Sequence, residues 1–154
     1  MVDRILRVAN CSGFYGDRLS AAREIVDDGP RDVLTGGYLA ELTLAILHRQ
    51  RAKRPELGYA TTFLTQMEQV LGTCLQRGIR VVANAGGLNP KGLAEALARL
   101  AAKLGLRPRI AYITGDDVLD RLERWQREGH ALAHLDRGVP LATRESDHRQ
   151  STQS

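Results

Sequence analysis

The sequence contains few cysteines, few aromatic residues and no long hydrophobic run, and each shortage excludes a class of protein. Two cysteines in 154 residues are too few for a disulfide framework, so both thiols are expected to be reduced. Aromatic residues make up 5% of the chain, which argues against base stacking with single-stranded nucleic acid. No apolar stretch approaches the roughly 18 residues of a membrane span, and the N-terminus does not resemble a secretory signal. The sequence therefore predicts a cytoplasmic protein that does not enter the membrane.

The charged residues do not indicate a nucleic-acid partner. The chain has 22 Lys and Arg against 18 Asp and Glu, a net charge of +4. Its densest basic stretch, residues 48–54, ends an expected helix, where cations interact favourably with the helix dipole. The length suits a single domain, expected over residues 1–141. From Arg144 onward no side chain is apolar, so residues 142–154 are expected to form a disordered polar tail.

Short apolar stretches alternate with segments of helical periodicity. Strands are expected at residues 5–9, 33–34, 81–83 and 110–114. The apolar positions that mark five helices are Leu19, Ala22, Ile25 and Val26; Leu39, Leu42, Ile46 and Leu47; Phe63, Met67, Val70 and Cys74; Leu93, Leu97, Leu100 and Leu104; and Val118, Leu122 and Trp125. This alternation predicts an α/β fold: a three-layer Rossmann-like parallel sheet of about four or five strands, with helices on both faces.

Each expected strand runs directly into a loop of small and polar residues. In a parallel sheet these loops lie together outside the carboxyl ends of the strands, where open α/β sheets bind ligands. The candidate ligand-binding residues of the first three loops are Asn10, Cys11, Ser12, Thr35, Asn84, Gly86, Gly87 and Asn89. The candidate acidic residues are Asp17, Asp116 and Asp117. We expect all of these loops to share one cleft.

The third loop, residues 84–90, has two interpretations. Asn89 suits a helix N-cap and Pro90 the first helical position, so the loop opens a helix whose start attracts anions. Gly86 and Gly87 would let backbone amides approach a phosphate, a carboxylate or an oxyanion. The alternative is a tight glycine turn followed by an ordinary helix cap. The glycine spacing matches neither the dinucleotide fingerprint nor the P-loop, so no nucleotide cofactor is expected.

The acidic residues also allow two roles. Asp116 and Asp117 follow a strand and open a helix, where carboxylates act as caps. One of them could instead point into the cleft as a general acid or base, or take a cation such as Mg²⁺. Asp17 could cap the first helix or stand across the cleft from Asp116.

Other reactive residues lack the partners that catalysis would need. Cys11 and Ser12 follow the first strand, but no base is identifiable for either, and the Gly-x-Ser-x-Gly motif is absent. His130 and His134 have the spacing of two metal ligands on a helix, but no third ligand is recognisable. No metal site and no cofactor are therefore expected.

At these same loops the sequence resembles a known family. Four segments closely resemble, in the same order, motifs of the acyclic terpene utilisation protein family: residues 7–18, 34–43, 84–90 and 115–117. This family is associated with bacterial breakdown of citronellol and geraniol. The resemblance covers roughly residues 4–141 and corresponds to the N-terminal portion of the longer family members. It implies acyl-CoA intermediates of branched, unsaturated acids and a lyase-type or hydratase-type step. In one departure, Gly37 stands where the family usually has aspartate.

Two functional hypotheses follow from the residues and the resemblance together. In the first, the loops bind an acyl-CoA or a related acid; Asp116 or Asp117 is the acid or base, Asn84 and the Gly86 and Gly87 amides are oxyanion donors, and Asn10 and Asp17 orient the substrate. In the second, favoured by Gly37, the chain is a non-catalytic binding or assembly subunit. In both, we expect a homo-oligomer or a separate partner subunit, because a small sheet leaves strand edges and apolar faces open.

Overall fold

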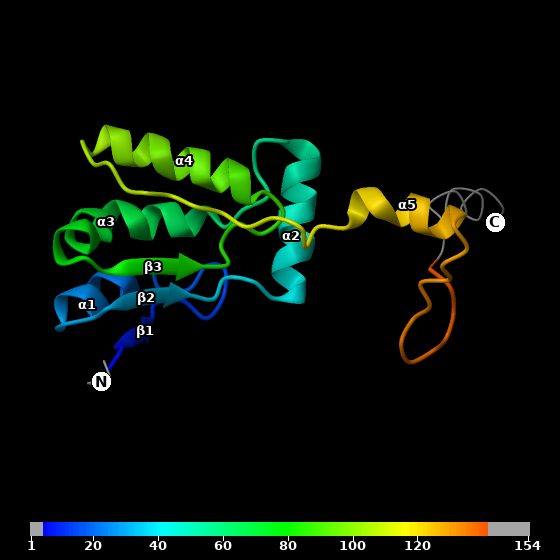
Figure 1. The fold of residues 1–154 in the computed structure, drawn as a ribbon, viewed down its shortest axis with the longest axis horizontal. Coiled ribbons are helices and arrows are strands. Elements are labelled where there is room, and N and C mark those ends of the chain that lie inside the picture. Colours follow the sequence, from blue (N-terminus) through cyan, green and yellow to red (C-terminus); the bar gives the residue numbers. More distant parts are fainter. Residues whose placement is uncertain (1–4, 142–154) are drawn as a thin grey trace, which may run out of the picture. The chain divides into compact units, whose positions relative to one another are not determined.

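The computed structural model describes residues 5–141 and contains three strands and five helices within them (Figure 1). The elements, in chain order, are β1 (Val8–Asn10), α1 (Ala21–Asp27), β2 (Val33–Gly36), α2 (Glu41–Lys53), α3 (Thr61–Arg77), β3 (Arg80–Ala83), α4 (Pro90–Lys103) and α5 (Leu119–Arg127). The chain divides after Thr114 into two compact units, which are described separately. The expectation of one domain over residues 1–141 stays a prediction, and the expected disordered tail lies outside the described residues.

The first unit is built on a parallel sheet in the order β1-β2-β3. Val8 pairs with Val33, and Val33 pairs with Arg80. One helix connects β1 to β2 and two consecutive helices connect β2 to β3, as the sequence predicts. Parallel strands require such crossovers, because each chain segment must return to the same end of the sheet. All three strands therefore end at one edge, which carries the loops that follow them.

The core lies between one face of this sheet and helices α1, α3 and α4. Leu34 of β2 is fully buried, together with Val26 of α1 and Val70 of α3. Leu93 and Ala96 of α4 extend the same cluster. The positions that predict α3 from the sequence are buried as expected, because residues three and four apart lie on one face of a helix.

The opposite face of the sheet is largely exposed. Residues alternate between the two faces along a strand, so Val8, Val33 and Val82 point away from Leu34. Val8 is 55% exposed and Val82 is 60% exposed. Helices on both faces are expected from the sequence, but within residues 5–141 the buried core covers one face only. This part of the prediction is corrected by the structure.

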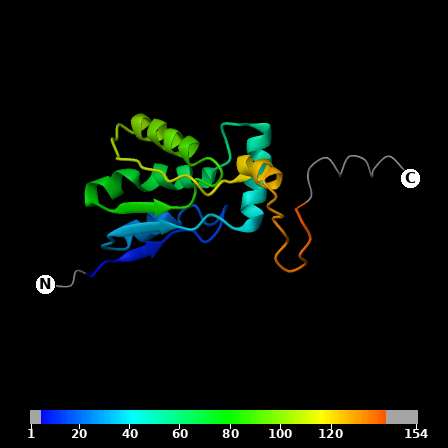
Figure 2. The same ribbon diagram turned by 45° about the vertical axis from the view of Figure 1, so that its right-hand side comes forward.

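The expected fourth strand is also absent. Residues 110–114 have no strand assignment, and Ile113 and Tyr112 are 91% and 49% exposed. Figures 1 and 2 show this part of the chain returning from the end of α4 toward the edge at which the strands end. Because a strand is defined by its hydrogen-bonded neighbours, apolar β-branched composition alone was not sufficient to form one here. The sheet therefore has three strands in the described part of the chain, not the expected four or five.

Three helix boundaries follow directly from the sequence. Asn89 caps α4 through its side chain, and Pro90 occupies the first turn. Gly78 ends α3 with φ of 68°, a left-handed conformation that glycine adopts without steric cost. Helix α2 ends two residues before Pro55, which cannot continue a helix. In Figures 1 and 2, α2 stands across the edge of the sheet toward which the strands point.

The second unit, described over residues 115–141, consists of α5 and the turns that follow it. Helix α5 has no buried residue. A backbone hydrogen bond of 2.8 Å joins His134 N–H to the Val139 carbonyl and closes the last turn. No helix within residues 5–141 combines the length and apolar character needed to cross a membrane.

Candidate functional site

The loops after the three strands form one continuous rim at the carboxyl edge of the sheet. The Cys11 amide donates to the Thr35 carbonyl at 2.8 Å, and the Gly37 amide donates to the Ser12 carbonyl at 2.8 Å. The Asn84 amide donates to the Gly36 carbonyl at 3.4 Å. These bonds continue the pairing of the strands into the loops. The structure therefore brings the first three predicted loops together, as the parallel sheet requires.

Two of the predicted binding residues form a polar pair on the exposed side of the rim. The Thr35 hydroxyl donates to Asn10 Oδ1 at 3.2 Å and also lies 3.2 Å from the Ala9 carbonyl. Asn10 Nδ2 donates to the Ser12 carbonyl at 2.9 Å. The Asn10 side chain is exposed and is held in one orientation by these bonds. Its amide group is therefore held in a fixed orientation at the surface of the rim.

Asn84 is the predicted residue whose geometry best suits a ligand. Its Oδ1 accepts a hydrogen bond of 2.7 Å from the Tyr38 amide, which determines the orientation of the side-chain amide. Its Nδ2 has no hydrogen-bond partner among the described residues, and the residue is exposed. A side-chain amide held by its oxygen leaves its two N–H donors for a carbonyl, carboxylate or oxyanion.

A buried polar cluster around Tyr38 and Gln66, which the sequence did not predict, links the second rim loop to α3. The Tyr38 hydroxyl donates to Gln66 Oε1, and both side chains are 1% exposed. Gln66 Nε2 donates in turn to the Arg18 carbonyl at 3.3 Å. The Tyr38 ring meets the Phe63 ring edge to face, with centroids 5.7 Å apart. One signal was available: Gln66 lies three residues after Phe63, on the face of α3 that the apolar spacing predicts to be buried.

The two possible nucleophiles, Cys11 and Ser12, are buried in the same region. Burial raises the pKa of the Cys11 thiol, and a hydrogen bond with Tyr38 offsets this effect only in part. Burial also raises the pKa of the Tyr38 hydroxyl, and Cys11 adds to that increase. Ser12 is 3% exposed, and its hydroxyl donates to the Phe14 carbonyl at 3.0 Å. Since reactive cysteines are exposed thiolates, this environment suits a structural residue.

Asp17 closes the first loop. Its Oδ2 accepts from the Gly13 amide at 2.9 Å, and its Oδ1 accepts from the Arg18 amide at 2.7 Å. These two backbone hydrogen bonds, with Gly13 contributing most, hold the pKa of Asp17 below its ordinary value. Helix α1 begins at Ala21 with Ser20 at the N-cap position, so Asp17 orders the loop and does not cap the helix.

Most backbone amides of the glycine loop after β3 donate to backbone carbonyls of the protein. Gly87 N–H donates to the Asn84 carbonyl at 3.3 Å, and Asn89 N–H donates to the Gly86 carbonyl at 2.9 Å. Leu88 N–H reaches the Gly58 carbonyl at 2.9 Å. Gly87 has φ of 52°, and an added Cβ would stand 2.8 Å from the Gly58 carbonyl oxygen. The amide of Gly87 and those of the next two residues therefore already donate to backbone carbonyls.

Asn89 is also committed to structure. Its Oδ1 accepts from Gly92 N–H at 2.9 Å, which caps α4. Its Nδ2 donates to the carbonyls of Leu57 at 3.0 Å and Glu56 at 3.2 Å. This side chain fastens the start of α4 to the segment that precedes α3. Of the third loop, Asn84 and Gly86 remain as candidates for ligand contact.

Asp116 and Asp117 belong to the second unit. The Asp117 Oδ1 accepts from Leu119 N–H at 3.1 Å just before α5, whose N-cap residue is Val118. Asp116 is exposed and makes no hydrogen bond or ion pair among the described residues. His134 Nδ1 accepts from Asp136 N–H at 3.1 Å, so this histidine stabilises a turn. Within residues 5–141, no group of three or more His, Cys, Asp or Glu side chains is arranged to hold a metal ion.

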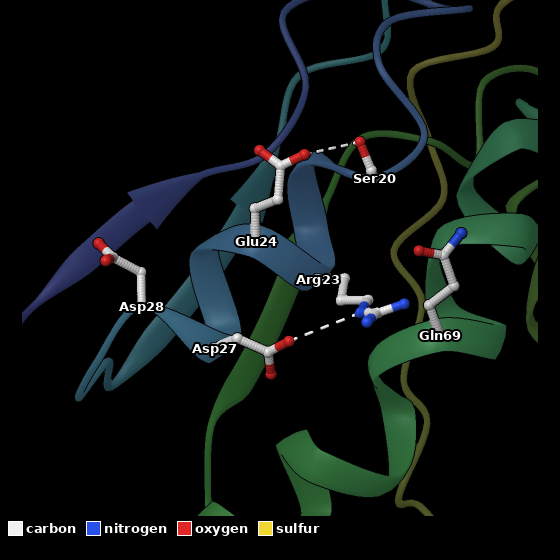
Figure 3. A pocket seen from close by; sticks show the side chains of 6 residues that line it. All are labelled: Ser20, Arg23, Glu24, Asp27, Asp28 and Gln69. Carbon is white, nitrogen blue, oxygen red and sulfur yellow. Dashed lines mark hydrogen bonds and ion pairs between the residues drawn. The ribbon is translucent and has the colours of Figure 1, made fainter.

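A shallow hollow of about 520 Å³ lies along α1, away from the predicted binding residues (Figure 3). It is lined by Ser20, Arg23, Glu24, Asp27, Asp28 and Gln69. Figure 3 shows Arg23 directed toward Asp27, with which it forms an ion pair of 3.6 Å. The Ser20 hydroxyl donates to Glu24 at 2.7 Å. Because its charged side chains pair with one another along an open helix face, this hollow is not a better candidate than the rim.

Similarity to known sequences identifies the family. The sequence matches the acyclic terpene utilisation family protein AtuA over residues 6–153. No curated protein and no solved structure matches the sequence significantly. The matched region contains all three rim loops and both units of the described structure. The chain therefore belongs to the acyclic terpene utilisation family, AtuA.

Proposed function

We propose that this member of the acyclic terpene utilisation family binds a branched acyl-CoA or a related carboxylic acid at the rim. The observation that carries the proposal is the exposed Asn84 side chain, whose oxygen is held by the Tyr38 amide and whose Nδ2 has no hydrogen-bond partner among the described residues. An amide fixed in this way stabilises a carbonyl or carboxylate oxygen without reorganising when the ligand arrives. Asn10 and Thr35 would supply further polar contacts beside it.

The chemistry we propose at this position is a lyase-type or hydratase-type step, in which a thioester enolate is stabilised and a proton is moved. The donors of the rim would hold the developing oxyanion. Asp17 is a poor proton donor, because two amides hold its pKa below the ordinary value. Asp116 and Asp117, which the sequence offers as the acid or base, belong to the second unit, and their part in this step stays a prediction. Both cysteines are free and buried, which suits a protein of the reducing cytoplasm.

The alternative function is a non-catalytic binding or assembly subunit, and one observation favours it. Gly37, which replaces the usual aspartate of the family, leaves an unfilled position on the rim. A Cβ added to Gly37 would lie 3.4 Å from the Ser12 carbonyl oxygen, with no other close contact. Position 37 thus has room for the Cβ of a larger residue. Loss of a carboxylate with retention of the binding loops is the pattern expected of a subunit that binds without turnover.

The experiment is calorimetric titration of the chain with a branched, unsaturated acyl-CoA thioester and with its free acid. Asn84→Asp is the informative variant, because its carboxylate can still accept from the Tyr38 amide but no longer donates to a ligand oxygen. We expect this change to weaken binding at least about tenfold, the cost of one lost charge-assisted contact plus like-charge repulsion. Gln69→Glu, the same chemical change on the exposed side of α3, is the matched control and should bind like the unaltered chain.

The outcomes separate the two functions. Saturable binding with release of a product supports the catalytic hypothesis, and saturable binding without product supports the subunit hypothesis. Binding that is equally strong in Asn84→Asp, or no binding at all, would show that the rim is not the ligand site.

A further inference from the structure

Helix α2 has a buried face and an exposed face, and the exposed face contains much of its apolar surface. Thr43 and Leu47 point into the first unit and are 6% and 0% exposed. On the other side Leu42 is 73% exposed and Ile46 is 37% exposed, with Ala45 exposed between them. The sequence predicts Leu42 and Ile46 as part of the packed face of this helix, and the structure corrects that expectation.

The exposed residues of α2 have the spacing of a helix–helix seam. Leu42, Ala45, Arg49 and Ala52 follow one another at intervals of three, four and three residues, and all four are exposed. This is the spacing of the contact positions in paired helices, and alanines in such a seam allow the helix backbones to approach closely. Helix α2 has 13 residues, about 20 Å at 1.5 Å per residue, which is long enough to present nearly two heptads.

The charges on this seam are complementary when two copies of α2 pack antiparallel. Glu41 lies at the start of α2 and Arg49 lies near its end. Neither side chain forms an ion pair among residues 5–141. An axis through Ala45 places Glu41 four residues before it and Arg49 four residues after it. In an antiparallel pair of α2 helices, each Glu41 therefore lies at the same level as an Arg49 of the other helix, about 6 Å from the axis.

We propose that α2 is a dimerisation surface whose occupant is a second copy of this chain, bound antiparallel about a two-fold axis close to Ala45. A two-fold interface uses the same surface twice, so the two Glu41–Arg49 pairs form together. Leu42 and Ile46 become buried on both sides of the axis. Antiparallel packing also opposes the two helix dipoles. A lipid surface is a poorer occupant, because an anionic membrane favours basic residues along the whole helix and α2 begins with an acid.

This interface would bring two rims together in the dimer. Helix α2 follows directly from the second rim loop and stands across the edge of the sheet that carries the rim (Figure 2). Dimerisation through α2 would therefore place the two candidate ligand sites on neighbouring parts of the assembly. The inference does not depend on the proposed function, since it is drawn from residues that the proposed ligand does not contact.

Sedimentation velocity across the micromolar range tests the proposal. The chain has a mass of 17.0 kDa, and we expect a concentration-dependent shift toward twice that value. Glu41→Arg alone and Arg49→Glu alone should each weaken dimerisation about tenfold, because each replaces two attractive contacts with two repulsive ones. The double variant carrying both changes should recover dimerisation, since the pairs form again with the charges exchanged.

Two further variants complete the test. Leu42→Glu should leave a monomer at all concentrations, because it places carboxylates in the apolar centre of the interface. Arg99→Glu, the same charge change as Arg49→Glu on the exposed side of α4, should dimerise like the unaltered chain. These side chains are exposed, so circular dichroism should show an unchanged fold. A monomer throughout the concentration range, or a double variant as weak as the single variants, would overturn the proposal.

Discussion

The hydrogen bond between Tyr38 and Gln66 is the buried contact on which we expect the stability of the rim to depend most. Tyr38→Phe removes the hydroxyl and leaves Gln66 Oε1 without its partner in a site that is 1% exposed. An acceptor left unsatisfied in such a site costs about 1–3 kcal/mol. We expect Tyr38→Phe to lower the free energy of unfolding by about 2 kcal/mol, with little change in the packing against Phe63, because the ring remains.

The free energies of unfolding of the single and double variants show whether the loss comes from the Tyr38–Gln66 hydrogen bond or from substitution in general. Gln66→Leu leaves the Tyr38 hydroxyl without its acceptor and should also be destabilising. In the double variant both polar groups are gone, so the loss should be smaller than the sum of the single losses by about 1–2 kcal/mol. Tyr112→Phe is the matched control, because the Tyr112 hydroxyl is exposed and has no hydrogen-bond partner among the described residues.

Equilibrium unfolding in urea, followed by far-ultraviolet circular dichroism, measures these differences. Tryptophan fluorescence is less suitable, because the single tryptophan, Trp125, lies in the second unit. Strict additivity of Tyr38→Phe and Gln66→Leu would refute the reasoning. So would a loss for Tyr112→Phe as large as that for Tyr38→Phe.

Two further predictions concern the loops. Gly87→Ala should lower the free energy of unfolding by about 3 kcal/mol, because the left-handed backbone and the crowded surroundings both oppose a methyl group. Gly78→Ala should lower it by only about 1 kcal/mol, because Gly78 shares the backbone conformation but has no atom within 4 Å of the added carbon. Equal unfolding midpoints of the two variants in urea would contradict this prediction. Asp17→Asn should be destabilising at neutral pH, and the difference should shrink as the pH falls below 3.8, the ordinary pKa of this carboxyl, because a lowered pKa in the folded state stabilises the protein only while the group is ionised. Acid titration of both proteins by circular dichroism would show whether the difference instead persists at low pH.

Local sequence signals determined much of what is observed in single elements. Asn89 and Pro90 predict the start of α4, and the structure confirms both the side-chain cap and the proline in the first turn. Gly78 predicts the end of α3 and adopts the left-handed conformation there. These features depend on backbone geometry within a few residues. They can be read from the chain because no distant partner is needed to form them.

The convergence of the loops was also determined by the sequence, through the alternation of strands and helices. Parallel strands must end at one edge, so Asn10, Thr35 and Asn84 were expected to lie together, and the backbone bonds of the rim confirm that they do. The role of each side chain was not determined in this way. Gly87 and Asn89 looked like ligand contacts, but the Gly87 amide bonds within its own loop and the Asn89 side-chain amide bonds to the segment before α3.

Only the tertiary structure decided which surfaces are covered. The apolar spacing of Leu42 and Ile46 suggested a packed helix face, and the composition of residues 110–114 suggested a strand, yet these residues are mainly exposed. Gln66 shows the converse, a polar residue fully buried because Tyr38 reaches it from another loop. Periodicity indicates that a segment has an apolar side; whether that side is buried depends on contacts between residues far apart in the chain. The sequence therefore determined the alternating elements, the helix ends and the meeting of the loops, whereas the exposed face of α2 and the buried Tyr38–Gln66 contact depend on packing between segments that no local pattern specifies.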